Sequence, residues 1–93
     1  MLIGVCEIEF FIPASGSLKE KRFVLESIKK RVRQKFNVSI AEVGDTEKWQ
    51  HGFLGLAIVS NANKFIDKVF SQVINLIEND SRLEVLKCET DVY

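Results

Sequence analysis

The chain has 93 residues, of which 46% are hydrophobic and 28% charged, with 13 basic and 13 acidic residues. We therefore predict one globular domain over residues 1–93 and exclude a chain that is basic throughout, as a general nucleic-acid binder would be. The sequence has no run of about 18 apolar residues and no basic leader, so we expect no membrane span or signal peptide and predict a cytoplasmic protein.

Residues 2–12 predict a first strand that ends before Pro13, because proline cannot continue a central strand. Successive side chains of a strand point to opposite faces of the sheet. The even-numbered residues from Leu2 to Ile12 are the more apolar set and predict the core face. The odd-numbered set includes Glu7 and Glu9, so it predicts a mixed, open face.

Residues 18–36 predict a helix. Ser17, followed three residues later by Glu20, matches a capping box. Apolar residues recur at the helical spacing and predict one buried stripe, formed by Leu18, Leu25, Ile28, Val32 and Phe36, with Val24 beside it. Phe23 lies on the opposite side of the helix and is predicted to be exposed.

The remaining predicted elements are two strands, a second helix and a last strand, over residues 37–44, 51–60, 62–78 and 83–92. The polar segment GDTEKWQ joins the second and third strands as a hairpin loop that carries Trp49. Asn61 is the predicted cap of the second helix. In the last strand both Val85 and Leu86 are apolar enough for burial, so the sequence does not determine which side of this strand faces the core.

This order of elements, β-α-β-β-α-β, predicts an α+β fold of the ferredoxin-like sandwich type. Its antiparallel four-stranded sheet has the strand order 4-1-3-2, and both helices cover one face. The other face is open to solvent or to a partner. The topology also places the start of the first helix, the loop of residues 44–50 and the end of the second helix at one end of the molecule.

Positive charge is concentrated in the first helix. Residues 19–35 hold eight basic and two acidic residues, a charge of +6, and the remaining residues hold five basic and eleven acidic, a charge of −6. Three cations, Lys19, Lys21 and Arg22, lie in the first turns, where they oppose the helix dipole. A bound phosphate group would relieve this conflict.

We therefore predict a surface that binds an anion or RNA, with an aromatic ring that stacks on a base. Its predicted residues are Ser15, Ser17, Lys19, Lys21, Arg22, Lys29, Lys30, Arg33 and Trp49. The alternative explanation is that nearby carboxylates pair with these cations, namely Glu20, Asp45, Glu47, Glu78 and Asp80.

The open face of the predicted sheet carries an apolar patch, and such patches usually mark an interface. Its residues are Ile3, Val5, Phe11, Phe53 and Val59. Glu7 and Glu9 share this face at about 7 Å, a distance at which two carboxylates can act together. No pocket is predicted around them, so we predict no catalytic residues.

The sequence predicts no metal site and no cofactor. The lone His51 has no second ligand at a metal-binding spacing, and no phosphate-binding glycine loop or dinucleotide motif is present. Cys6 and Cys88 lie far apart in strand-like segments, and we predict that both are reduced core residues.

Two segments resemble a known family of small bacterial domains of unknown function, the YlxP-like family. They are SLKEKRFVLESIKKRVRQKFNVSIAEV and WQHGFLGLAIVSN, and the similarity extends over nearly the whole chain. The resemblance implies a ferredoxin-like fold and a bacterial cytoplasmic protein. In many bacteria the family's gene lies near genes for translation initiation and ribosome maturation, and the family offers no catalytic residues to transfer.

The sequence thus predicts a small non-enzymatic binding domain, associated with RNA or ribosomal particles through its basic first helix. The alternative is a protein-interaction or homodimerising module that uses the open sheet face without nucleic acid.

Overall fold

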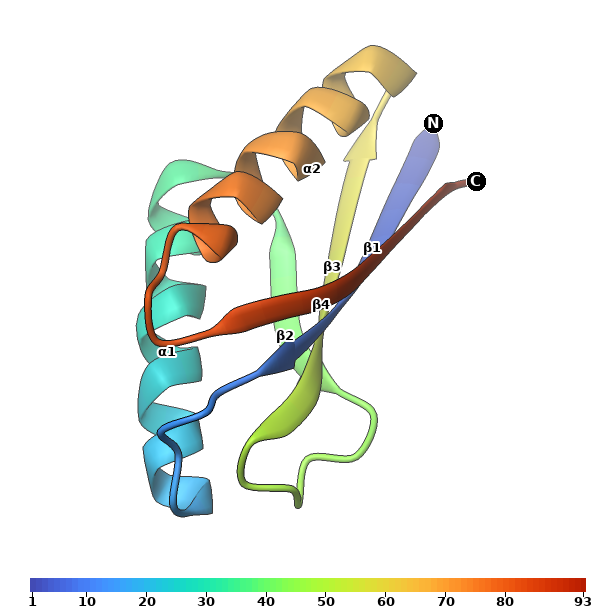
Figure 1. The fold of residues 1–93 in the computed structure, drawn as a ribbon. Coiled ribbons are helices and arrows are strands. Elements are labelled where there is room, and N and C mark those ends of the chain that lie inside the picture. The colour runs from blue at the N-terminus through green and yellow to red at the C-terminus, as the bar shows by residue number, and fades with distance from the viewer.

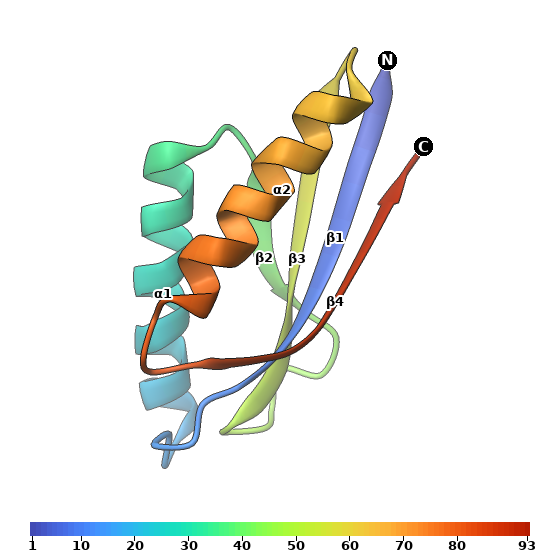
Figure 2. The ribbon, with the colours of Figure 1, turned by 45° about the horizontal axis from the view of Figure 1, so that its top comes forward.

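Four strands form one antiparallel sheet, and two helices cover one of its faces (Figures 1 and 2). The computed structural model describes residues 1–93, with the elements β1 (Leu2–Phe11), α1 (Leu18–Lys35), β2 (Ser39–Val43), β3 (His51–Ser60), α2 (Asn63–Glu78) and β4 (Glu84–Val92). The strand order is β2-β3-β1-β4, which confirms the predicted ferredoxin-like sandwich. Neither helix is long and apolar enough to cross a membrane.

The core lies between the sheet and the two helices. On β1 the buried residues are the even-numbered ones from Gly4 to Phe10, as predicted from the alternation. The buried stripe of α1 contains Val24, Leu25, Ile28 and Val32. Gly4 permits α2 to approach closely, because a Cβ atom there would lie 2.5 Å from the side chain of Ile66.

The start of α1 confirms the predicted capping box. The Glu20 N–H donates to Ser17 Oγ at 3.1 Å, and the Glu20 carboxylate accepts from the Gly16 N–H. The predicted cap of α2 is wrong: the N-cap residue is Ala62, which makes no side-chain hydrogen bond. The Ser60 hydroxyl instead accepts from the Ala62 N–H at 3.1 Å, so this turn is closed one residue before Asn61.

A β-bulge determines which of Val85 and Leu86 in β4 faces the core. Glu9 pairs with Lys87 and Phe10 pairs with Val85, so Leu86 is the extra residue. Val85 therefore packs against the core, whereas Leu86 is exposed.

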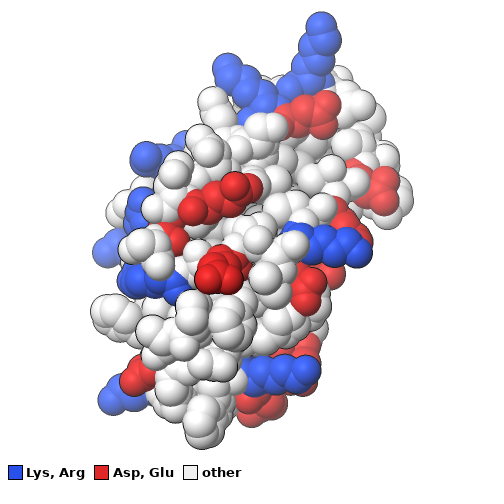
Figure 3. All heavy atoms as spheres, in the orientation of Figure 1, with Lys and Arg blue, Asp and Glu red and all other residues white.

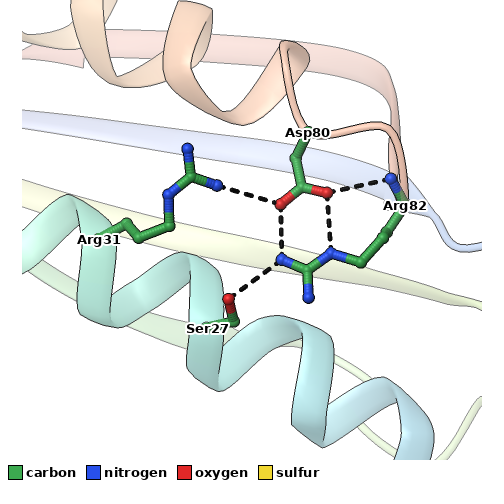
Figure 4. A network of polar contacts seen from close by, with 4 residues as sticks. All are labelled: Ser27, Arg31, Asp80 and Arg82. Carbon is green, nitrogen blue, oxygen red and sulfur yellow. Dashed lines mark hydrogen bonds and ion pairs between the residues drawn. The ribbon is translucent and has the colours of Figure 1, made fainter.

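The end of α2 lies beside the middle of α1, not beside its start as predicted, because α2 runs obliquely to α1 (Figures 1 and 2). The buried carboxylate of Asp80 accepts from Arg82 at 2.7 Å and from Arg31 at 3.3 Å, and Arg82 also donates to Ser27 Oγ (Figure 4). Asp80 therefore does not pair with the cations of the first turns of α1.

Hydrogen bonds from the Arg82 guanidinium and backbone hold the pKa of Asp80 below its ordinary value. A depressed carboxyl pKa stabilises the fold above the unfolded pKa, about 3.9, and this contribution is lost as pH falls through the folded value. We expect Asp80→Asn to lower the free energy of unfolding at neutral pH by roughly 1.5–3 kcal/mol. The difference from the wild type should shrink below about pH 4, as measured by urea unfolding across pH.

The matched control is Asp67→Asn, which removes an exposed carboxylate of α2 and should change stability by less than about 0.5 kcal/mol. Equal losses in the two variants, or a loss at Asp80 that is independent of pH, would contradict this account of the network.

Candidate functional site

Lys21 is buried, although it belongs to the predicted anion-binding cluster. Its side chain is 1% exposed, and Nζ lies 2.7 Å from Glu42 Oε2. The ammonium also donates to the carbonyl oxygens of Lys48 at 2.7 Å and Thr46 at 3.4 Å, and it lies 5.9 Å from the centroid of the Phe10 ring. Within the protein the ammonium is therefore held by two carbonyl hydrogen bonds and by its ion pair with Glu42.

The prediction that Lys21 binds an anion or RNA is wrong for this reason. Its charge is balanced by Glu42, whose buried Oε2 atom has no other partner. The pair links α1 to β2, and the two carbonyl contacts link α1 to the loop of residues 44–50. The predicted proximity of this loop to the start of α1 is thus confirmed.

The hydroxyls of the lead-in are also engaged within the protein. Ser15 is buried and its Oγ donates to the Ser17 carbonyl at 3.0 Å, while Ser17 caps the helix. The carboxylate of Glu20 lies at the helix start and binds the Gly16 N–H, so α1 already has its own anion there. Ser15 therefore does not belong to an exposed binding surface, and Ser17 has a structural role.

Three further cations of α1 contact groups of the protein. Lys29 pairs with Glu26 at 2.6 Å, and Arg31 pairs with Asp80. Arg33 Nη2 donates to the Ile40 carbonyl at 3.0 Å, and Arg33 forms no ion pair. The hydrogen bond from Lys29 lowers the pKa of the Glu26 carboxyl, and the charge of Arg33 contributes to this shift.

The outward side of α1 retains a cationic surface, which we call the basic face: Lys19, Arg22, Lys30 and Arg33. None of the four forms an ion pair. Phe23 lies among them and is 72% exposed, as predicted. Phe23, Lys30 and Arg33 line a surface hollow of about 530 Å³ on this side of the helix, together with the carboxylate of Glu26 and the polar residues Ser27 and Gln34. In Figure 3 lysine and arginine side chains follow the margin at which α1 lies.

Trp49 lies in the loop that Lys21 links to α1, and it is 57% exposed. It borders a hollow of about 660 Å³ together with residues of β1, the helix lead-in and the loop itself. Gln50 fixes the end of this loop, since its side-chain amide donates to the Pro13 carbonyl at 3.0 Å. The structure therefore holds an exposed indole ring close to the start of the basic face.

The open sheet face carries the predicted apolar residues on the side opposite to the helices. Val59 and Ile3 are 61% and 39% exposed, and Val5, Phe11 and Phe53 are half-buried. The ring of His51 packs edge-on against Phe53 at 5.3 Å between centroids, and His51 Nε2 contacts the Glu9 carboxylate. Neither contact of His51 is predicted from the sequence.

The two cysteines are free thiols in different surroundings. Cys6 is buried as predicted, and burial raises its pKa to about 11, so its thiol stays protonated at neutral pH. The prediction that Cys88 is a core residue is wrong, because β4 is an edge strand and Cys88 is exposed on it.

Comparison with known proteins identifies relatives of unknown function. Residues 3–90 match the family described as "Protein of unknown function (DUF503)". The chain is 42% identical over 83 residues to "Uncharacterized protein YlxP" of Bacillus subtilis (strain 168), an alignment that covers 89% of this chain and 90% of that protein. The predicted resemblance to the YlxP-like family is thus confirmed.

Two solved structures of designed proteins share the fold. The de novo designed protein Foldit4 has a TM-score of 0.58 and 12% identity, with 100% of this chain and 97% of that chain covered. The de novo designed protein LFR1 1 with ferredoxin fold has a TM-score of 0.57 and 13% identity, with coverages of 99% and 85%. At these identities the likeness shows the fold alone.

The buried position of Lys21 leads to a stability prediction. Lys21→Met should lower the free energy of unfolding by roughly 3–5 kcal/mol, because it leaves the Glu42 carboxylate and two loop carbonyls without their partner. The fluorescence of Trp49, the single tryptophan of the chain, should also change in the folded variant as the loop loses its link to α1. Urea unfolding and emission spectra measure both effects.

Lys19→Met is the matched control on the outward side of the same helix turn, and its effect should stay within about 0.5 kcal/mol. The double variant Lys21→Met with Glu42→Leu should recover a large part of the lost stability, since it removes the orphaned charge. A single variant as stable as the wild type would show that the pair does not hold this end of the molecule together.

Proposed function

The chain belongs to the DUF503 family of proteins of unknown function, and we propose that it is a small non-catalytic domain that binds RNA along α1. One observation carries this proposal: the basic face presents four cations that form no ion pair, around an exposed aromatic ring and with Glu26 as the one carboxylate among them. The partner is RNA, either free or within a ribosomal particle.

The arrangement of the basic face suits a phosphate backbone. Lys19 and Arg33 are 14 residues apart, which corresponds to about 21 Å along a helix. This length allows the side chains to follow consecutive phosphates of one strand. Affinity from such contacts comes from released counterions and falls steeply with salt. Because the net charge of the chain is zero, binding is confined to this face and does not extend over the whole surface.

Two exposed aromatic rings favour a single strand over a duplex. Phe23 lies within the basic face, and Trp49 lies on the loop at its start. Aromatic rings bind unpaired bases by stacking, which is worth roughly 1–3 kcal/mol per base. Duplex bases are already stacked on one another and cannot use these rings. Cations beside exposed rings are therefore the expected composition of a single-strand surface.

A second candidate function is a protein-interaction or homodimerising module that uses the open sheet face. Its support is the exposed pair of Ile3 and Val59, which face each other across β1 and β3. They continue a row of apolar side chains that neither helix covers.

Removal of the basic face should weaken RNA binding. We expect Lys19→Ala, Arg22→Ala and Lys30→Ala together to lower affinity for a labelled single-stranded RNA and to flatten its salt dependence. For single strands the slope of log affinity against log salt should fall by about 0.7 for each lost phosphate contact. Fluorescence anisotropy over a series of salt concentrations measures both quantities.

A second triple variant controls for net charge. Lys64→Ala, Lys68→Ala and Lys87→Ala remove the same charge from exposed positions of α2 and β4, outside the basic face. This variant should retain most of the affinity. The proposal fails if both triple variants behave alike, or if neither changes the binding or its salt slope.

Trp49 should contribute by stacking and not by charge. We expect Trp49→Leu to weaken binding of single-stranded RNA by about tenfold, which is within the energy of one stacked base, with an unchanged salt slope. Trp49→Tyr should retain most of the affinity because it keeps an aromatic ring. In the wild type, RNA should quench tryptophan emission. An unaltered emission at saturating RNA would remove Trp49 from the interface.

A further inference from the structure

We propose that the open sheet face docks an amphipathic helix of a partner protein that carries lysine or arginine along one border of its apolar side. The proposal deepens the second candidate function and rests on it. The site is a hollow of about 410 Å³ at the centre of this face. Its floor is apolar and formed by Val5, Ala41, Val43, Gly55 and Ala57, and one side of it is acidic and formed by Glu7, Glu89 and Asp91.

The hollow exists because small residues occupy neighbouring positions on adjacent strands of the sheet. Glu7 pairs with Gly55, and Gly55 pairs with Ala41, so two of the three central positions have little or no side chain. A Cβ atom on Gly55 would lie 3.0 Å from the side chain of Val43 on β2, so Val43 packs directly over the backbone of β3 and forms part of the floor. The hollow thus accepts apolar side chains from outside.

The acidic side of the hollow holds charge that the protein leaves unbalanced. Glu7 lies directly opposite Glu89 on the neighbouring strand, an arrangement that destabilises a sheet. Lys87 pairs with Glu89 at 2.8 Å, whereas Glu7 and Asp91 form no ion pair. A cation supplied by a partner would offset this repulsion. The apolar floor and acidic border therefore select a partner that is apolar in the middle and basic along one edge.

A helix fits this face better than an added strand. At one edge, β2 has only five residues, and Arg33 already occupies the Ile40 carbonyl. At the other edge, β4 carries charged residues at alternate positions over 87–91, which discourages strand pairing. The opposite face of the sheet is already covered by α1 and α2, and a third helix would complete a three-layer arrangement.

A second copy of the chain does not match the site. A two-fold contact places the same patch of each copy against the other. Centred on this hollow, it would bring Glu7 and Asp91 against their own copies and increase the repulsion. We therefore expect sedimentation velocity to show a monomer at all accessible concentrations, and a dimer that Val5→Lys dissociates would overturn the proposal in favour of self-association.

Model peptides test the stated chemistry directly. The probe is a labelled amphipathic helix of leucine and lysine, about 15 residues long so that it can form a helix. Its matched counterpart replaces every lysine by glutamate. We expect the leucine–lysine peptide to bind at least about tenfold more tightly, with its NMR footprint on Val5, Ala41, Gly55 and Ala57 and not on the helices.

Three variants distinguish peptide binding in the hollow from non-specific attraction between a basic peptide and the acidic residues of the protein. Ala41→Trp fills the floor without changing charge, and Glu7→Gln with Asp91→Asn neutralises the border; each should weaken peptide binding about tenfold. Glu47→Gln with Glu78→Gln removes the same charge at exposed positions outside the hollow and should leave the affinity for the peptide unchanged. Wild-type affinity in the first two variants, or equal losses in all three, would overturn the proposal; circular dichroism and thermal unfolding establish that each variant is folded.

The RNA proposal is tested separately by the same proteins. The variant that lacks Lys19, Arg22 and Lys30 should bind the peptide as the wild type does, and the Ala41→Trp variant should bind RNA as the wild type does. Loss of peptide binding in the α1 variant would place the peptide on α1 and overturn the docking proposal without affecting the RNA proposal.

Discussion

The arrangement of α1, β2 and the loop that carries Trp49 depends on the ion pair between Lys21 and Glu42. Two charges removed from water destabilise a fold unless their remaining hydrogen-bonding capacity is also satisfied. Here the ammonium has a carboxylate and two carbonyl acceptors, so the contact joins α1, β2 and the loop of residues 44–50 at one point. Gly52 leaves room for it, since a Cβ atom there would lie 3.2 Å from Lys21 Nζ and from Glu42 Oε2. The placement of Trp49 near α1 is thus determined by a contact outside its own segment.

The segment SLKEKR combines a structural and an exposed set of cations within one helical turn. Successive residues of a helix differ by about 100° in direction, so Lys21 points into the core while Lys19 and Arg22 point to solvent. The conflict between these cations and the helix dipole is reduced from within the protein, by Glu42 beside Lys21 and by Glu20 at the helix start. What the fold leaves unbalanced is the charge on the outward side, and this charge defines the basic face.

Periodicity was sufficient to predict most of the fold. The alternation in β1 and the apolar stripe from Val24 to Val32 in α1 each predict one buried face, and these faces are buried in the structure. The charge of Lys21 predicts a position in a binding cluster, whereas its spacing, three and four residues before Val24 and Leu25, predicts a position on the buried stripe, and the structure follows the spacing. Glu42 gives the matching signal, since it follows the buried Ile40 by two residues and shares its face of β2. The pair becomes evident only when the topology brings α1 against β2.

The separation of charge between the two sides of the molecule explains how a chain of zero net charge can have strongly charged surfaces. The basic face lies on the helix layer, and the carboxylates of Glu7 and Asp91 lie on the far side of the sheet. A helix with its side chains is about 10–12 Å thick, so the two surfaces are further apart than the Debye length of about 8 Å at physiological ionic strength. Salt in the solvent therefore screens the two surfaces from each other, so the two proposed partners would not compete through charge.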